Sequence, residues 1–210
     1  KSFIRRYRIG IGLLLLLFTI WLFSLPANLF PDPTSTVVLS KHEQLLGARI
    51  ADDGQWRFPD IDSVPDKFGK AVLLFEDRYF YKHPGINPVS MFKALVYNFK
   101  TGKRIGGSTI TQQVIRLSRK NPPRSYYEKL LESMKATRLE VRYSKDNILR
   151  LYASHAPFGG NTVGLSAASW RYYGLSPDKL SWAEAATLAI LPNAPSLIFP
   201  GKNEETLRKK

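Results

Sequence analysis

Residues 104–113 read RIGGSTITQQ, a glycine pair followed by a run rich in Ser, Thr and Gln. Two adjacent glycines let the backbone approach a ligand closely, and Ser108 can cap a helix that starts after it. Exposed amides at the start of a helix suit a phosphate group. The residues by themselves predict a flexible loop and a capped helix, and they leave open whether the loop binds a phosphate or is merely structural.

Upstream of this loop, residues 76–85 read EDRYFYKHPG and follow an apolar helical run. An acid placed where an apolar helix meets a Pro/Gly break lies at the edge of a cleft, where partial desolvation can raise its pKa enough for it to act as a base. The alternative is a helix-end carboxylate that pairs with Arg78 or His83, and Glu76 and Asp77 alone favour this alternative.

Helical spacing of apolar residues begins at about Pro65 and predicts a mainly α domain over residues 60–200. Gly and Pro interrupt the spacing at positions 84–85, 106–107, 122–123, 159–160 and 192. Before this domain, short β-type runs within residues 35–58 flank a turn at residues 52–54. We therefore predict a linker and a small β-hairpin stalk over residues 26–59.

The amino-terminal part of the chain combines a basic cluster with an apolar run. Residues 9–25 contain no charge and are just long enough to span a bilayer. The alternatives are a cleaved signal peptide and a buried core helix, but the run is longer than a usual signal-peptide core and residues 24–27 form a poor cleavage site. We predict a cytoplasmic basic tail over residues 1–8 and a transmembrane anchor over residues 9–25, with the rest of the chain outside.

The charge of the chain points to an anionic partner. Lys and Arg total 31 against 17 acidic residues, a net charge of +14, and residues 100–145 alone hold 12 basic and three acidic side chains. Nucleic acid, anionic lipid and a phosphorylated substrate all fit such an excess. The chain has no cysteine and three histidines, which excludes a disulfide framework and does not favour a metal site built from Cys or His.

EDRYFYKHPG followed by GGSTITQQ resembles the first two motifs of the peptidoglycan glycosyltransferases of class A penicillin-binding proteins. A third family motif is matched by Lys129 and Glu132, a fourth by residues 145–149 with Tyr152, and a fifth by the glycine-rich and aromatic residues within 159–174. The resemblance covers about residues 60–200. It implies a mainly α, lysozyme-like helical fold, and it makes residues 201–210 the start of a connection to a C-terminal domain.

The resemblance also implies a reaction and a set of site residues. The C4 hydroxyl of an acceptor sugar would attack the anomeric carbon of lipid II with inversion, and a lipid pyrophosphate would leave. Glu76 matches the catalytic base, and Glu132 matches a second catalytic carboxylate near the pyrophosphate, with Mg²⁺ or Mn²⁺ as a candidate cation. The residues that match substrate contacts are Asp77, Phe80, His83, Gly107, Ser108, Thr109, Gln112, Gln113, Arg116, Arg124 and Lys129. If one helix includes Arg124, Lys129 and Glu132, they share one face.

The implied partners are lipid II, the growing lipid-linked glycan chain, the membrane and cell-wall synthesis proteins, with no nucleic acid. The implied location is the inner membrane, with a single pass and the catalytic domain on its outer side. Two departures from the family pattern matter. Glu128 stands where the family usually has Arg, which puts one phosphate contact in doubt, and residues 153–154 are Ala-Ser where Leu-Asn is usual, a change that we expect to affect packing.

Three other functions remain as hypotheses. A lysozyme-like glycan hydrolase also uses acidic residues on a helical domain, but it needs neither a basic pyrophosphate site nor a lipid anchor. A degenerate membrane scaffold that binds wall precursor without turnover is kept open by the departures at Glu128, Ala153 and Ser154. A nucleic-acid binder is motivated by charge alone, and its basic stretch would face the outside of the membrane.

Residues 88–99 place apolar side chains at helical spacing, with Lys93 and Lys100 at the margins. The spacing by itself favours an amphipathic helix that faces the core, and the alternative is a helix that lies in the membrane surface. Because the donor's reactive carbon lies only a pyrophosphate away from its lipid, the cleft must open at the bilayer surface. We therefore predict that this helix contacts the membrane.

Overall fold

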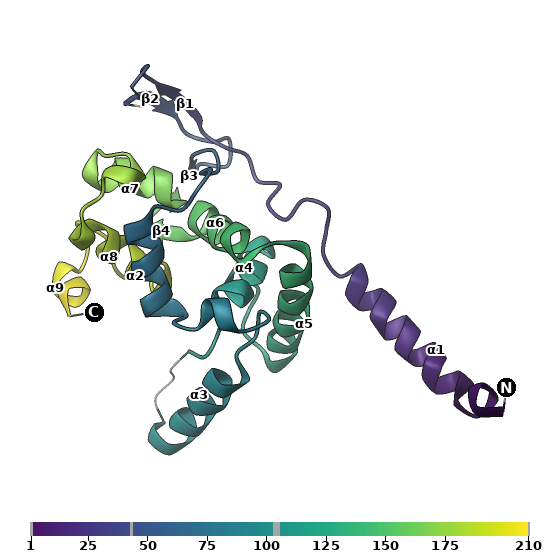
Figure 1. Cartoon of the computed structure of the whole chain (residues 1–210). Helices are drawn as coiled ribbons and strands as arrows, with labels where there is room; N and C mark the ends of the chain where they lie inside the picture. Colours follow the sequence, from purple (N-terminus) through teal and green to yellow (C-terminus); the bar gives the residue numbers. More distant parts are fainter. Residues whose placement is uncertain (1, 43, 103–105, 210) are drawn as a thin grey trace.

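The computed structural model describes residues 2–42, 44–102 and 106–209, without the side chains of residues 2–6 and Leu95. Arg104 and Ile105 of the quoted loop lie outside the described residues. Figure 1 shows a body of helices from which α1, α3 and a two-stranded hairpin extend in different directions.

The helical region follows the predicted breaks closely. Its helices are α2 (Asp66–Glu76), α3 (Pro88–Thr101), α4 (Ile110–Ser118), α5 (Tyr126–Arg142), α6 (Lys145–His155), α7 (Leu165–Tyr173), α8 (Trp182–Ile190) and α9 (Glu204–Arg208), with 3-10 turns at Phe80–Lys82, Pro177–Lys179 and Leu191–Asn193. Side chains at Asn87, Thr109, Ser125, Ser144 and Ser181 accept backbone N–H groups at helix starts, as helix caps do. The prediction of a mainly α fold is confirmed.

Two small sheets complete the fold. β1 (Thr36–Leu39) and β2 (Leu45–Arg49) pair antiparallel and form a hairpin within the predicted stalk, but the predicted turn at residues 52–54 follows β2 and lies outside this hairpin. The second sheet has the order β3-β5-β4 and was not predicted. In it, β3 (Trp56–Arg57) runs parallel to β5 (Thr162–Val163), which pairs antiparallel with β4 (Pro157–Gly159). This sheet joins the stalk to the helical body across about a hundred residues of sequence.

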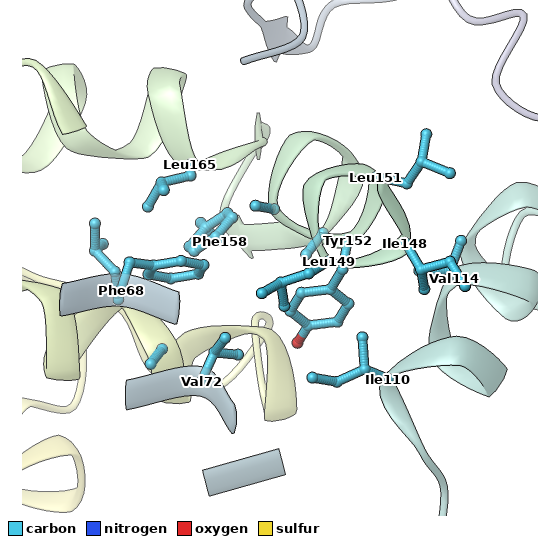
Figure 2. Close-up of a cluster of buried hydrophobic side chains, with 14 of the residues drawn as sticks. Phe68, Val72, Ile110, Val114, Ile148, Leu149, Leu151, Tyr152, Phe158 and Leu165 are labelled. Carbon is cyan, nitrogen blue, oxygen red and sulfur yellow. The ribbon is translucent and has the colours of Figure 1, made fainter. Parts of the chain in front are cut away.

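The hydrophobic core holds together the helices that carry the predicted site. Helix α2 packs on α8, and α4 packs on both α5 and α6. Figure 2 shows Phe68 of α2, Ile110 and Val114 of α4, and Tyr152 of α6 in one buried cluster. Removing such a side chain leaves a cavity and costs a few kcal/mol, roughly 2–5 for a large aliphatic residue. The relative positions of α2, α4 and α6 are therefore set by packing.

Helix α3 differs from the other helices of the body. It projects away from them (Figure 1), and the side chains of Phe92 and Phe99 are 67% and 92% exposed. Among its described side chains, Ala94 is the one buried hydrophobic residue. The interpretation of residues 88–99 as a core-facing helix is therefore wrong, because the apolar face made by Phe92 and Phe99 is open to solvent. Contact of this face with a membrane stays a prediction.

Helix α1 (Ser2–Leu22) begins within the predicted basic tail and ends beside α5. No helix within the described parts of the chain is both long and apolar enough to cross a membrane. The anchor at residues 9–25 stays a prediction.

The end of α1 is bound to the second half of α5 by polar contacts. Trp21 Nε1 donates to Thr137 Oγ1 at 3.0 Å, and Arg138 Nε donates to the carbonyl of Leu22 at 2.9 Å. Arg142 donates to two further carbonyls of the linker, those of residues 26 and 27, at 2.6 Å each. The guanidinium groups of Arg138 and Arg142 therefore bind backbone carbonyls of the segment that enters the domain.

Candidate active site

Glu76 is the last residue of α2, where the apolar helix ends against α4. Its side chain is half-buried, and its Oε2 accepts a hydrogen bond from Gln113 Nε2 at 2.7 Å. The structure thus brings together two residues that are predicted from separate motifs. A half-buried carboxylate whose hydrogen-bond donor is a neutral amide can act as a base.

Asp77, the next residue, faces inward instead. Its carboxylate lies 3.0 Å from Nε2 of His83 and accepts the N–H of Ile110, the first residue of α4, at 3.0 Å. Phe80 is buried beside this pair, and Lys145 Nζ lies 4.4 Å above its ring. Asp77, Phe80 and His83 therefore lie together and form a packed support that fixes the end of α2 against the start of α4, and their contact with substrate stays a prediction.

The start of α4 corrects one detail of the sequence analysis. Its N-cap is Thr109, not Ser108: Thr109 Oγ1 accepts the N–H of Gln112 at 3.1 Å, and the Gln112 side chain accepts the N–H of Thr109 at 3.1 Å. This reciprocal capping box is stabilised further because Thr109 Oγ1 donates to the carbonyl of Gly85 at 2.6 Å. The amides of Ile110 and Gln112 are used inside the protein, so they are not open to a phosphate.

Gly107 has a packing role. A Cβ at this position would lie 3.0 Å from the Cβ of Ala94 and 3.0 Å from the carbonyl oxygen of Ser90, both on α3. The absence of a side chain lets the loop approach α3 closely. The neighbouring Ser108 is free of the capping role and turns its hydroxyl to Lys129.

Lys129 and Glu132 lie one turn apart on α5 and form the centre of a polar network. Lys129 Nζ donates to Glu132 Oε2 at 3.1 Å, to Ser108 Oγ at 2.6 Å and to Gln112 Oε1 at 3.3 Å. Arg116 Nε lies 4.0 Å from the other oxygen of Glu132. Glu132 is 5% exposed, and a carboxylate so buried is tolerated because two cations compensate its charge.

Three cations converge on this network. Burial lowers the pKa of both Lys129 and Arg116, while the negative charge of Glu132 opposes the shift. The positive charge of Arg124 lowers the pKa of both side chains further. Positive groups held close together in spite of their repulsion indicate a site for an anion.

Arg124 reaches the site from a loop. Helix α5 begins at Tyr126 and is capped by Ser125, so the helix carries Lys129 and Glu132 but not Arg124. The idea that all three share one helical face is corrected in this respect. Arg124 follows a Pro-Pro pair and is exposed, which suits a side chain that meets a ligand from the open side.

The two departures from the family pattern have local structural roles. Glu128 forms a two-point ion pair with Arg119, whose Nη2 lies 3.3 Å from Oε1, and so it ties the end of α4 to the start of α5. It does not contact Glu132. Ala153 and Ser154 are buried in α6, and Ser154 Oγ accepts the N–H of Ile61 at 3.4 Å, which agrees with the predicted packing role.

A cavity of 380 Å³ opens beside this network and is lined by Gln113, Arg116, Arg124 and Tyr152. A larger one of 490 Å³ lies between α2 and α6, but its lining contains none of the predicted site residues. We place the site at the smaller cavity, because its lining includes Gln113, which donates to Glu76, and the cations Arg116 and Arg124.

The predicted divalent cation has no protein-built site here. Within the described residues, no group of three or more His, Cys, Asp or Glu side chains could hold a metal ion. Both oxygens of Glu132 face Lys129 and Arg116, with which a divalent cation would compete. A cation stays a prediction of the sequence, and no step below depends on it.

Glu140 is a site-supporting residue that the sequence analysis missed. Its Oε1 accepts from Thr111 Oγ1 at 2.6 Å and from Lys145 Nζ at 2.8 Å, and Lys145 also donates to the carbonyl of His83 at 2.7 Å. This network joins α4, α5 and α6 behind the site. The one available signal was its position on α5, eight residues after Glu132, which puts it near the same face.

Comparison with known proteins places the molecule in a family. The family model described as transglycosylase matches residues 43–210, and the chain belongs to that family. It is similar to penicillin-binding protein 1C of Escherichia coli, with 46% identity over 157 residues, which cover 73% of this chain and 20% of that protein.

Two further relatives widen the comparison. Penicillin-binding protein 1A/1B of Bacillus subtilis is 36% identical over 191 residues, which cover 89% of this chain and 20% of that protein. Penicillin-binding protein 1A of Escherichia coli is 38% identical over 141 residues, which cover 67% and 17%. The chain thus spans about a fifth of the length of these curated relatives. The stalk pattern and the APFGGN run at residues 156–161 resemble the 1C subgroup in particular.

Proposed function

We propose that this chain is a peptidoglycan glycosyltransferase that polymerises lipid II into β-1,4-linked glycan strands and releases undecaprenyl pyrophosphate. One observation carries the proposal: Gln113, which donates to the half-buried Glu76, lines one cavity together with the cations Arg116 and Arg124. Membership of the transglycosylase family supports it.

The residues divide the chemistry between them. Glu76 takes the proton of the acceptor's C4 hydroxyl as the oxygen attacks the anomeric carbon. The bond from that carbon to the pyrophosphate oxygen breaks in the same displacement, so the configuration inverts. Arg116, Arg124 and Lys129 stabilise the negative charge that grows on the leaving group, and charge-assisted hydrogen bonds to phosphate are the strong kind.

Glu132 cannot contact pyrophosphate without repulsion, so its role is to position cations. It holds Lys129 and Arg116 by its two oxygens. A glycan hydrolase would also use two carboxylates, but it has no leaving pyrophosphate that needs three positive side chains. The cations therefore favour the transferase over the hydrolase. A scaffold without turnover is distinguished by the experiment below.

The proposed place of action is the outer face of the inner membrane. The apolar run at residues 9–25 would anchor the chain, and the exposed face of α3 would lie in the membrane surface beside the lipid of the substrate. Lipid II, the growing lipid-linked chain and other cell-wall synthesis proteins are the proposed partners.

Glu76→Gln tests the proposal directly. The change keeps the shape of the side chain and removes the base, so polymerisation of purified lipid II should fall to a few per cent or less, while folding and lipid II binding stay nearly intact. Glu205→Gln, on the exposed α9, is the matched control and should retain full activity. Polymerisation by Glu76→Gln at more than a few per cent of the parent rate contradicts the assignment of the base. Binding of lipid II without any polymerisation by the parent chain would support the scaffold.

A further inference from the structure

Tyr152 has a hydroxyl group that the fold buries without using it. The side chain is fully buried on α6, and Oη has no hydrogen-bond partner among the described residues. Tyr172 shows the usual arrangement, since its hydroxyl donates to the carbonyl of Phe158 at 3.0 Å. Buried polar groups are nearly always hydrogen-bonded, so an exception beside a candidate site calls for a functional reason.

Tyr152 lies beside the candidate site. Figure 2 shows its hydroxyl pointing away from α6, toward the side of the core where Val72 of α2 and Ile110 of α4 lie. The residue lines the 380 Å³ cavity together with Gln113 and Arg116. The charges of Glu76 and Arg116 both act on the phenol, which places it near the carboxylate and the guanidinium.

The protonation state of the phenol suits a donor. Burial, and then the negative charge of Glu76, raise the pKa of Tyr152 well above its ordinary value, and Arg116 opposes this only in part. The hydroxyl therefore keeps its proton at any working pH. A phenol O–H can donate one hydrogen bond, a carboxylate can only accept, and a guanidinium can only donate. Of the two charged neighbours, only Glu76 can accept a hydrogen bond from the hydroxyl.

We propose that Tyr152 is a positioning residue for the base, and that its hydroxyl donates a hydrogen bond to Glu76 when the anionic donor substrate occupies the cleft. This inference rests on the proposed function. Before the substrate binds, Arg116 serves Glu132 and also acts on Glu76. A pyrophosphate draws Arg116 toward itself, and its own negative charge disfavours the ionised form of Glu76. The Tyr152 hydroxyl carries no positive charge, so the pyrophosphate does not draw it away. Its hydrogen bond then keeps Glu76 ionised and directed at the acceptor.

The other groups around Glu76 do not replace this donor. Gln113 donates to Oε2 and is neutral. Lys129 and Arg116 contact Glu132 and, with Arg124, form the proposed pyrophosphate side of the site. Loss of the Tyr152 hydroxyl should therefore raise the pKa of Glu76 in the loaded site, because a hydrogen bond to the ionised form is removed.

The first experiment measures kcat against pH at saturating lipid II, using the full chain in detergent, because kcat reports the pKa of groups in the substrate-bound enzyme. In Tyr152→Phe the acidic limb should move upward by about one pH unit, while the rate above that limb stays within about threefold of the parent. Tyr172→Phe also loses a hydroxyl hydrogen bond and should leave the limb in place. A uniform loss of rate with an unmoved limb overturns the proposal, because it shows a structural or substrate-binding role.

A second measurement does not need turnover. In full-length protein with ¹³C-labelled glutamate carboxyl groups, the Glu76 signal is identified by its loss in Glu76→Gln and titrated with inorganic pyrophosphate present. Tyr152→Phe should raise the Glu76 pKa by about one unit. An unchanged Glu76 pKa in Tyr152→Phe overturns the proposal whether or not the parent polymerises lipid II. If the parent is inactive but Tyr152→Phe raises the Glu76 pKa, the proposed function fails and this inference stands.

A third experiment tests the same hydrogen bond without the Tyr152→Phe substitution, in case that variant does not fold. Fluorotyrosine at all ten tyrosine positions makes each phenol a more acidic donor. The pKa of Glu76 should then fall below that of the parent under the same conditions. A fluorinated protein with an unmoved Glu76 pKa overturns the proposal.

Discussion

Helices α3 and α4 follow each other in the chain and both carry apolar residues at helical spacing, but the apolar face of α4 is buried and that of α3 is exposed. In α4 the side chains of Ile110, Val114 and Ile115 are fully buried. In α3 those of Phe92 and Phe99 are mostly exposed. The spacing of apolar residues shows that a helix has an apolar face, but it does not show what covers that face.

The difference between the two helices has a cause in their polar residues. Helix α4 is fixed at its start by the capping box, by the bond from Thr109 to Gly85 and by the carboxylate of Asp77, so its apolar face is pressed into the core. Helix α3 is capped by Asn87 and ends at Gly102 in the left-handed region, and these features stabilise the helix itself without binding it to the body.

The largest expected effect tests the buried side of this comparison. Ile115→Ala should lower the free energy of unfolding by about 2–5 kcal/mol, because it leaves a cavity in the core. Phe99→Ala should change the free energy of unfolding by about 0.5 kcal/mol or less, since that ring is 92% exposed. Denaturant unfolding of the full chain in detergent measures both. A similar loss of stability in the two variants would show that α3 packs on the body after all.

The second prediction concerns the polar side of α4 and the loop after it. Arg116→Ala and Arg124→Ala should each reduce kcat/KM for lipid II by about 10–100-fold, the loss expected for a hydrogen bond to a charged group. The reduction should be larger at high salt, which screens the charges that remain. Arg208→Ala, on α9, is the control. A change in melting temperature without a change in kcat/KM would remove the phosphate role of these arginines.

The smallest effect concerns the exposed face of α3. The protein is shortened to begin at Trp21, which keeps the contacts of Trp21, Arg138 and Arg142 between α5 and the segment before the stalk. Phe92→Ser with Phe99→Ser should reduce binding to vesicles of anionic phospholipid on the order of tenfold without lowering the melting temperature, because two apolar side chains leave the lipid.

The control for this prediction is Trp182→Ser with Leu197→Ser, which removes exposed apolar side chains from α8 and from the loop after it. These changes should leave vesicle binding in place. A shortened parent that never floats with vesicles would leave α3 without a membrane role.

The sequence predicted those features that depend on neighbouring residues. Gly and Pro placed the helix breaks, and the β-type runs around residues 36–49 placed the hairpin. Ser108 and Thr109 are both good N-caps, but Gln112 stands three residues after Thr109 and completes a capping box, a local signal that the sequence analysis missed. The pairing of β3 with β5 involves two residues on each side, too few to produce a pattern. The strand pairing was missed because it depends on a partner far away in the sequence.

The candidate site follows the same rule. The motif resemblance supplied Glu76, Glu132, Arg116 and Lys129, and the structure places all four around one cavity or its adjoining network. Sequence alone could not show that Asp77 turns inward to bind the start of α4 while its neighbour Glu76 turns to the site, because the two carboxylates differ only in position at the end of a helix.

Helix α5 carries Lys129 and Glu132 of the candidate site near one end and contacts the entry segment near the other. Its first half carries Glu132, and its second half binds the end of α1 through Thr137 and Arg138 and the linker through Arg142. The ten residues from Glu132 to Arg142 rise about 15 Å along the axis of an α-helix. The stiffness of one helix, rather than the length of a tether, thus sets how far the second carboxylate stands from the point where the chain enters the domain. Glu132 would therefore lie at a constant distance from the plane of any substrate that is held level with that entry point.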